Sequence, residues 1–240
     1  MVSASSMFME NKNYLIVGAS SGIGASLAAM LSEKGANVYT ASRHAGATPS
    51  VMHLNFDAQQ ADYQTFTTLP DILHGVVYCP GTINLKPFNR LSMTDFQADL
   101  QVNFLGAVGV LQAVLPKLKR AEGASVVLFS TVAVQTGMGF HASIASAKGA
   151  IEGLTRSLAA EWALSKIRVN AIAPSLTDTP LAEKLLATDE KRDASNRRHP
   201  MGRYGTANDV ASAAAFLLGD ESSWVTGQIF AVDGGMGRLK

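Results

Sequence analysis

Apolar residues along this chain follow two patterns that alternate from end to end. Short apolar runs, typical of buried strands, are separated by longer stretches in which apolar positions recur at helical spacing. Predicted strands cover 14–18, 38–41, 51–54, 73–78, 126–130, 168–173 and 229–232, and predicted helices cover 23–34, 59–68, 94–119, 142–164 and 207–218. Parallel neighbours need crossover connections, which are nearly always right-handed, so this alternation predicts a parallel sheet with helices on both faces.

The length of 240 residues fits a single α/β domain, and no repeat, low-complexity segment or linker marks a boundary. We expect one domain over 1–240, with 1–12 as a flexible N-terminal tail. The most polar stretch, 187–198, is expected to be a solvated helix or mobile loop. Its functional alternative is a lid over a substrate cleft, within a substrate-loop region at 180–203.

Composition narrows the classes of function. Hydrophobic residues make up 47% and charged residues 16%, which excludes general disorder. Twenty Lys and Arg against 19 Asp and Glu leave a net charge of +1, so no global field would bind nucleic acid or an anionic membrane. Any phosphate-bearing ligand must then be held locally.

The only cysteine, Cys79, excludes an internal disulfide and a thiolate metal cluster and fits a reducing compartment, so we expect a cytoplasmic protein without a metal site. Residues 1–13 contain no basic segment followed by an apolar run. Later apolar stretches are interrupted by Gly, Pro or charge short of a membrane span, so we expect neither signal peptide nor anchor.

A glycine-rich loop lies where the first predicted strand becomes the first predicted helix. There, backbone N–H groups and the positive helix end can receive a pyrophosphate, and glycine permits the tight turn and the close approach of phosphate. The alternative is an ordinary structural turn. The candidate cofactor-binding residues of this loop are Gly18, Ser20, Ser21, Gly22, Ile23 and Gly24.

The end of the second predicted strand bears on which dinucleotide is bound. An acid there would select NAD through the ribose 2′-hydroxyl, whereas an Arg suits the 2′-phosphate of NADP. The sequence has no acid there and places Arg43 after Ser42. We therefore expect NADP(H) to be preferred, with NAD(H) possible.

Several motifs occur together in register along the chain. They are the 18–24 loop, Gly81, Asn103, Ser130-Thr131, Lys148, Arg168-Val169-Asn170-Ala171-Ile172-Ala173-Pro174 and Val232-Asp233-Gly234-Gly235. By their order and spacing the chain is identified as a member of the short-chain dehydrogenase/reductase family. The resemblance implies a single Rossmann-type domain, three-layer α/β/α with a seven-stranded parallel sheet, and a nicotinamide cofactor.

The resemblance also implies a catalytic set. In that family a Ser polarises the substrate oxygen, a Tyr transfers the proton, a Lys lowers the Tyr pKa and binds the ribose, and an Asn holds a water. Matched by position, the Asn is Asn103, the Lys is Lys148, and the Ser position is Thr131, directly after Ser130. The Tyr position is Ile144, which carries no exchangeable proton, so this chain resembles an atypical member without the catalytic Tyr.

His141 is a candidate replacement for the proton donor. It lies seven residues before Lys148, which returns it to nearly the same helical stripe, and an imidazole titrates near neutrality. The alternative is that His141 merely caps or precedes the helix.

Further cofactor contacts are implied by position in the same family. Asn55 matches the adenine-contacting position, with Asp57 as a second candidate that could equally be a turn residue. Cys79, an apolar filler rather than a nucleophile, precedes the ribose-facing Gly81. Pro174, Thr177 and Thr179 resemble the nicotinamide clamp, and Thr179 also suits the N-cap of the next helix.

Two functions remain open from the sequence. The first is an NADP(H)-dependent oxidoreductase acting on the carbonyl or hydroxyl group of a small, largely apolar substrate with an altered acid-base set. The second is a catalytically impaired dinucleotide-binding protein that acts as a sensor or assembly partner. In either case we expect a homo-oligomer, a tetramer or a dimer, because 94–119 and 142–164 carry more apolar positions than one buried stripe requires.

Overall fold

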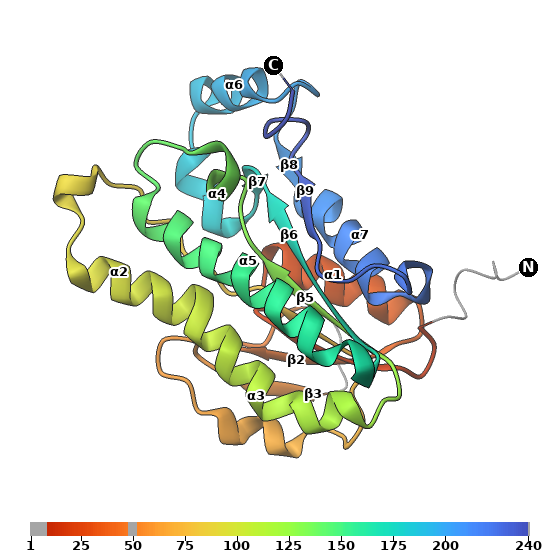
Figure 1. Cartoon of the computed structure of the whole chain (residues 1–240). Helices are drawn as coiled ribbons and strands as arrows, with labels where there is room; N and C mark the ends of the chain where they lie inside the picture. Colours follow the sequence, from red (N-terminus) through yellow and green to blue (C-terminus); the bar gives the residue numbers. More distant parts are fainter. Residues whose placement is uncertain (1–8, 48–51, 240) are drawn as a thin grey trace, which may run out of the picture.

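The computed structural model describes residues 9–47 and 52–239 and centres on one parallel sheet (Figure 1). Its seven strands follow the spatial order β3-β2-β1-β4-β5-β6-β9. Their bounds are β1 Asn13–Val17, β2 Asn37–Ser42, β3 Met52–Asn55, β4 Gly75–Tyr78, β5 Ala124–Phe129, β6 Ile167–Pro174 and β9 Ile229–Val232. Every pairing is parallel, so the predicted three-layer Rossmann architecture is confirmed.

Helices cover both faces of this sheet, and alternate strand residues serve opposite layers. In β1, Leu15 and Val17 join the core beneath α3 (Gly106–Lys119) and α5 (Ala142–Trp162). Tyr14 and Ile16 instead join the core beneath α1 (Gly22–Glu33) and α7 (Ala207–Leu218). Because both faces are covered, the strands are continuous apolar runs rather than alternating ones.

The remaining elements are short and lie mostly between the strands and these helices. They are α2 Met93–Leu100, α4 Ala133–Thr136, α6 Asp189–Arg198, the small parallel pair β7 Thr177–Asp178 and β8 Gly205–Thr206, and 3-10 turns at Tyr63–Thr68, Phe88–Arg90, Ala163–Ser165, Pro180–Leu185 and Asp220–Ser222. The polar stretch 187–198 is therefore a helix, α6, with Thr188 as its N-cap.

Most predicted boundaries hold within two residues, with one clear error. The helix predicted over 59–68 is only a 3-10 helix at Tyr63–Thr68, because Asp62 accepts the N–H of Gln64 and starts the helix late. Residue 51, predicted to open the third strand, lies outside the described residues.

The long helix predicted over 94–119 exists as a continuous helical run, but a π turn at Gln101–Leu105 separates α2 from α3. The Tyr78 hydroxyl donates to the carbonyl oxygen of Val102 at 2.6 Å, so a side chain from β4 binds the backbone inside this turn. A π turn inserts one extra residue and is frequently found at functional sites. It contains Asn103.

One expectation, about the length of the apolar stretches, requires correction. Met93–Lys119 is long and apolar enough to cross a membrane by length and composition alone, contrary to the expectation that each apolar stretch is too short. Its inner face, including Val110 and Val114, packs in the core of this domain. Of the predicted N-terminal tail, residues 1–8 lie outside the described residues. Within 9–12, Met9 is 3% exposed and Lys12 pairs with Asp220, whereas Glu10 and Asn11 are exposed.

Candidate active site

The glycine-rich loop joins β1 to α1 in a conformation that needs glycine at both ends. Gly18 has φ +83°, where other residues are strained, and a Cβ on Gly24 would collide with the Gly18 carbonyl oxygen. Ser21 makes no side-chain cap on α1, and the first turn of α1 contains no acid. The positive end of α1 is therefore open to an anionic ligand.

A cavity of about 490 Å³ lies over this loop. The predicted cofactor residues that line it are Gly18, Ser20, Ser21, Gly22, Ile23, Gly24, Arg43, Asp57, Cys79, Gly81 and Thr179. Asn55 does not line it: Asn55 ends β3 beside Ser42 and is exposed, so its predicted adenine contact is not supported by its position. Asp57 lines the cavity and also accepts the N–H of Gln59 at 2.9 Å, so it is a turn residue as well.

These residues fit a dinucleotide. Glycines leave room for a pyrophosphate where side chains would obstruct it. Arg43 is exposed at the end of β2, and within 9–47 and 52–239 no carboxylate pairs with it. Its guanidinium is thus available to a phosphate.

A second cavity, of about 510 Å³, adjoins the first. Ile23, Cys79, Gly81, Thr82, Thr179 and Leu181 line both cavities, so the two form one cleft. The second cavity brings together Thr131, His141, Lys148, Pro174 and Thr177 from the predicted site, along with Ile144. Most of its other lining side chains are apolar, among them Ile83, Leu85, Met138, Leu176, Leu181 and Leu185.

Lys148 lies on α5 at the wall of this cavity and is 7% exposed. Burial lowers its pKa to about 8 because a desolvated ammonium is disfavoured. Burial also raises the pKa of the Cys79 thiol to about 12, so Cys79 is uncharged at neutral pH and agrees with the apolar-filler interpretation.

Asn103 is fully buried within the π turn, in a network that the sequence did not reveal. Its amide nitrogen donates to Thr82 Oγ1 and to the Asp99 carbonyl oxygen, both at 2.8 Å. The Asp99 carboxylate, 2% exposed, accepts from Thr82 Oγ1 at 2.5 Å and Ser143 Oγ at 2.6 Å. The available signal was Asp99, an acid four residues before Asn103 on the same helical run.

The hydroxyls of Ser130 and Thr131, which directly follow β5, have different hydrogen-bond partners. Ser130 is 3% exposed and donates to Glu152 Oε1 at 2.8 Å. Thr131 Oγ1 accepts the N–H of Ala133 at 3.3 Å, which leaves its own proton for a ligand in the adjoining cavity. Thr131 is therefore the better placed of the two to bind a substrate oxygen.

His141 immediately precedes α5 and makes no side-chain cap on it. Its Nδ1 lies 2.6 Å from the carbonyl oxygen of Gly139. A carbonyl oxygen only accepts, so Nδ1 carries the hydrogen and Nε2 is the nitrogen left for other contacts. Ile144 follows one turn later, is 6% exposed, and lines the same cavity as Lys148.

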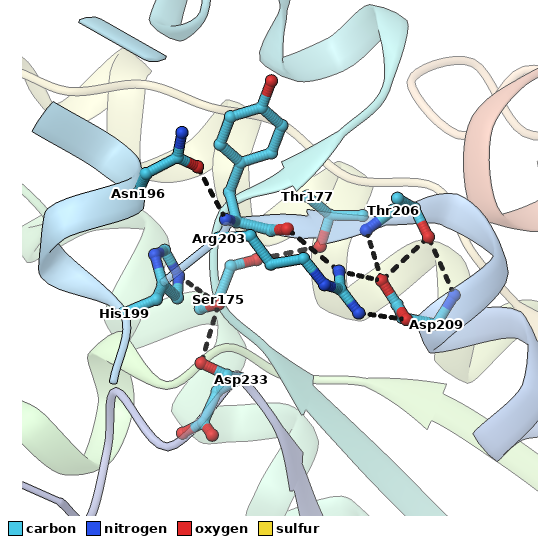
Figure 2. A network of polar contacts seen from close by, with 9 residues as sticks. Ser175, Thr177, Asn196, His199, Arg203, Thr206, Asp209 and Asp233 are labelled. Carbon is cyan, nitrogen blue, oxygen red and sulfur yellow. Dashed lines mark hydrogen bonds and ion pairs between the residues drawn. The ribbon is translucent and has the colours of Figure 1, made fainter. Parts of the chain in front are cut away.

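Ser175, directly after β6, is bound to a buried histidine from the end of α6 (Figure 2). Its Oγ lies 2.8 Å from His199 Nε2, and His199 Nδ1 donates to the Ser195 carbonyl oxygen at 2.7 Å. Farther along, Arg203 pairs with Asp209 at 2.6 Å and holds the pKa of that carboxyl well below its usual range. Nothing in the sequence indicated the pairing of Ser175 with His199.

Fold and cleft together define a nicotinamide-dinucleotide-binding Rossmann domain. Residues 18–237 match the family model described as enoyl-(acyl carrier protein) reductase, and the chain belongs to the short-chain dehydrogenase/reductase family. It is 32% identical to a tropinone reductase homolog of Arabidopsis thaliana, over 95% of this chain and 94% of the relative. It is 31% identical to a 3-oxoacyl-(acyl-carrier-protein) reductase of Thermotoga maritima, over 96% and 99% of the two chains.

Solved structures of other proteins have the same fold as this chain. The ligand-free aldohexose dehydrogenase of Thermoplasma acidophilum superposes with a TM-score of 0.89 at 28% identity, covering 97% of this chain and 96% of that one. A protein of Agrobacterium tumefaciens whose structure holds bound NADP gives a TM-score of 0.87 at 30% identity, covering 95% and 97%. The relatives are oxidoreductases by name, so an oxidoreductase is the class of enzyme that this family membership supports.

Proposed function

We propose that the protein is an NADP(H)-dependent oxidoreductase that interconverts a carbonyl and a hydroxyl group on a small, largely apolar molecule. One observation carries this proposal. The Thr131 hydroxyl, the His141 imidazole and the Lys148 ammonium line one apolar cavity that shares a wall with the dinucleotide cavity. A binding protein without turnover would have no need of this convergence.

The chain's own residues would act as follows. Bound NADPH supplies a hydride. Thr131 Oγ donates a hydrogen bond to the substrate oxygen, and Lys148 holds the nicotinamide ribose. Ile144 takes the place of the family's Tyr, so the proton for the product hydroxyl must come from another group. His141 in its imidazolium form carries a proton on Nε2, the nitrogen not bound to Gly139.

Lys148 is a second candidate donor because burial lowers its pKa to about 8, nearer to neutrality than an ordinary Lys. The choice between the two groups is testable. If His141 donates the proton, the rate of reduction falls as His141 loses its proton, and His141→Ala abolishes that pH dependence. If Lys148 donates, the fall in rate occurs near pH 8 and persists in His141→Ala.

The deciding experiment compares wild type, His141→Ala and Ile144→Tyr, each with NADPH and a panel of apolar ketones and aldehydes. We expect His141→Ala to lower kcat by about 10²- to 10⁴-fold, the usual contribution of a general acid. Its NADPH affinity, from calorimetry, should match wild type because His141 does not line the dinucleotide cavity. Full activity in His141→Ala would remove the histidine from the mechanism.

The absent phenol favours one alternative function, a dinucleotide-binding sensor or assembly partner. It makes a distinct prediction in the same experiment: wild type binds NADPH and reduces no substrate, while Ile144→Tyr gains activity. That outcome would replace the oxidoreductase proposal.

Preference for NADP(H) and self-association complete the proposal. Arg43, exposed and without a carboxylate partner in the described part of the chain, supports NADP(H) over NAD(H). Leu105 is 47% exposed at the start of α3 and Leu164 fully exposed just after α5, which supports a homo-oligomer formed through these helices. A monomer by light scattering at micromolar concentration would contradict it.

A further inference from the structure

The formal charges around the substrate cavity are all of one sign. Its lining includes Lys148, Lys191 and Arg198, and among its described lining residues there is no Asp or Glu. Lys148 is buried near the shared wall, whereas Lys191 and Arg198 come from α6 and are exposed. An apolar cavity with cations on one wall favours a ligand with an apolar body and an anionic end.

The two α6 cations share one face of the helix. Lys191, Ala194, Ser195 and Arg198 line the cavity and follow one another at the i, i+3, i+4, i+7 spacing of a single helical stripe. The acids of α6, which are Asp189, Glu190 and Asp193, fall outside this stripe and do not line the cavity. The small side chains of Ala194 and Ser195 leave space between the two charges.

Neither cation is neutralised by a carboxylate in the described residues. Lys191 Nζ donates to the Lys184 carbonyl oxygen at 2.8 Å, and Arg198 Nη2 donates to Ser195 Oγ at 3.2 Å. The ion pairs found within 9–47 and 52–239 involve neither residue. Both cations therefore retain charge and unused donors for a ligand.

The face that α6 presents to the cavity is fixed rather than free to rotate. Ser195 and His199 are each 2% exposed, and His199 Nδ1 donates to the Ser195 carbonyl oxygen. His199 Nε2 also contacts Ser175 Oγ at the end of β6 (Figure 2). Asn196 Oδ1 accepts the N–H of Tyr204 at 3.2 Å. These contacts anchor the C-terminal end of α6 and the side next to the stripe, and so direct the cationic stripe toward the cavity.

The position of the stripe distinguishes a substrate from the cofactor. The glycine loop and Arg43 line the dinucleotide cavity, whereas no α6 residue among the described residues does so. We propose that the substrate is an apolar oxo or hydroxy acid whose carboxylate, distant from the reacting carbon, is bound by Lys191 and Arg198. This inference rests on the proposed oxidoreductase function, because it names the substrate class of that same cleft.

The test uses methyl ketones that carry a terminal carboxylate two, four or six methylenes from the carbonyl, each compared with its methyl ester. With NADPH, we expect kcat/KM of the best acid to exceed that of its ester by at least about tenfold, which corresponds to about 1.4 kcal/mol. In the double variant Lys191→Gln, Arg198→Gln, the ratio of acid to ester should fall toward one, mainly through KM of the acid. Esters reduced as well as acids by wild type would overturn the inference.

The matched control is Arg197→Gln. Arg197 neighbours Arg198 on α6 and is exposed, but it does not line the cavity, so the preference for the acid should persist. A second readout is NADPH affinity, which should be equal in the double variant and wild type. A large loss of NADPH affinity in the double variant would show that the two cations bind the cofactor and would overturn the inference.

A binding measurement separates this inference from the proposed reaction. Calorimetry with heptanoate and with 1-heptanol, both in the presence of NADPH, reports on the anion site without turnover. Heptanoate binding that is tighter than heptanol binding and is lost in the double variant would support the anion site even if no ketone were reduced. Equal binding of the two probes by wild type would contradict the anion site whether or not the protein is an enzyme.

Discussion

The two halves of the cleft are built in different ways. The dinucleotide half is centred on one short loop, with six residues of 18–24 in its lining beside the segments that follow β2, β3 and β4. The substrate half is formed by side chains from segments far apart in the sequence, including 82–85, 129–148 and 174–198. The first half depends on glycine positions that tolerate no alternative, whereas the second can change its chemistry by exchanging single side chains.

The largest effect is expected from Gly24→Ala. A Cβ there collides with the Gly18 carbonyl oxygen, so the loop must shift away from its phosphate-binding shape. NADPH affinity, from fluorescence titration, should fall about 1000-fold, or about 4 kcal/mol. The control is Gly153→Ala, also helical but with no atom near its added Cβ among the described residues, which should bind NADPH normally. Near-normal NADPH binding by Gly24→Ala would show that the dinucleotide half does not depend on glycine at this position.

Lys148→Met tests the buried charge where the halves meet. The folded state lowers the Lys148 pKa from 10.5 to about 8, so the unfolded chain binds more protons between those pH values. Lys148 should therefore make the free energy of unfolding of cofactor-free protein rise by about 3 kcal/mol from pH 8 to 10.5, a contribution that is lost as pH falls through 8. The raised pKa of the Cys79 thiol acts in the opposite direction above about pH 9, so the Lys148 contribution is the difference between the pH profiles of wild type and Lys148→Met. Denaturant titrations of Lys148→Met should lack the rise, whereas the exposed-site variant Lys119→Met should retain it. A rise of equal size in Lys148→Met would contradict the assignment.

Ser175→Ala tests the polar contact behind the substrate half. It leaves buried His199 Nε2 without the hydroxyl that now lies 2.8 Å away, which should lower the free energy of unfolding by about 2 kcal/mol. Ser146→Ala is the matched control, because the exposed Ser146 hydroxyl bonds only to its own helix at Ala142 and should change stability by less than about 0.5 kcal/mol. Equal stability of the two variants would show that the Ser175 contact contributes nothing.

Arg43→Ala should have the smallest effect. Loss of a guanidinium at the end of β2 should weaken NADPH binding about tenfold, or about 1.4 kcal/mol, and leave NADH affinity unchanged. Calorimetry with both cofactors measures the two affinities. An equal loss for NADPH and NADH would mean that Arg43 does not recognise the 2′-phosphate.

The sequence predicted the fold well because strand and helix periodicity is a local property. The predicted runs recovered all seven strands of the central sheet, and the glycine loop, Thr131, His141 and Lys148 were all brought to one cleft. The helix predicted at 59–68 failed because one side chain, Asp62, decided where the helix starts. Asn55 does not line the cavity, so its adenine contact, taken from position relative to a family, stays a prediction.

The contacts that the sequence missed are those between distant segments. Thr82, Asp99 and Ser143 meet through hydrogen bonds across up to 44 residues, and Ser175 meets His199 across 24. No periodicity or spacing in the sequence predicts these long-range hydrogen bonds, because they form only when the loops after β4 and β6 pack against helices. The same holds for the α6 stripe, whose polarity was visible but whose facing toward the cavity was not.

The π turn at Gln101–Leu105 makes the geometry around Asn103 depend on a single residue of chain length. Removing one residue there would let α2 and α3 join as an ordinary α-helix, in which each residue turns the helix by about 100°. With α3 fixed by its core contacts, that rotation would swing the Asp99 carboxylate away from Thr82 and Ser143. A one-residue deletion in this turn would thus break the hydrogen bonds of Asp99 to Thr82 and Ser143 by rotating α2, although all three residues would remain in the sequence.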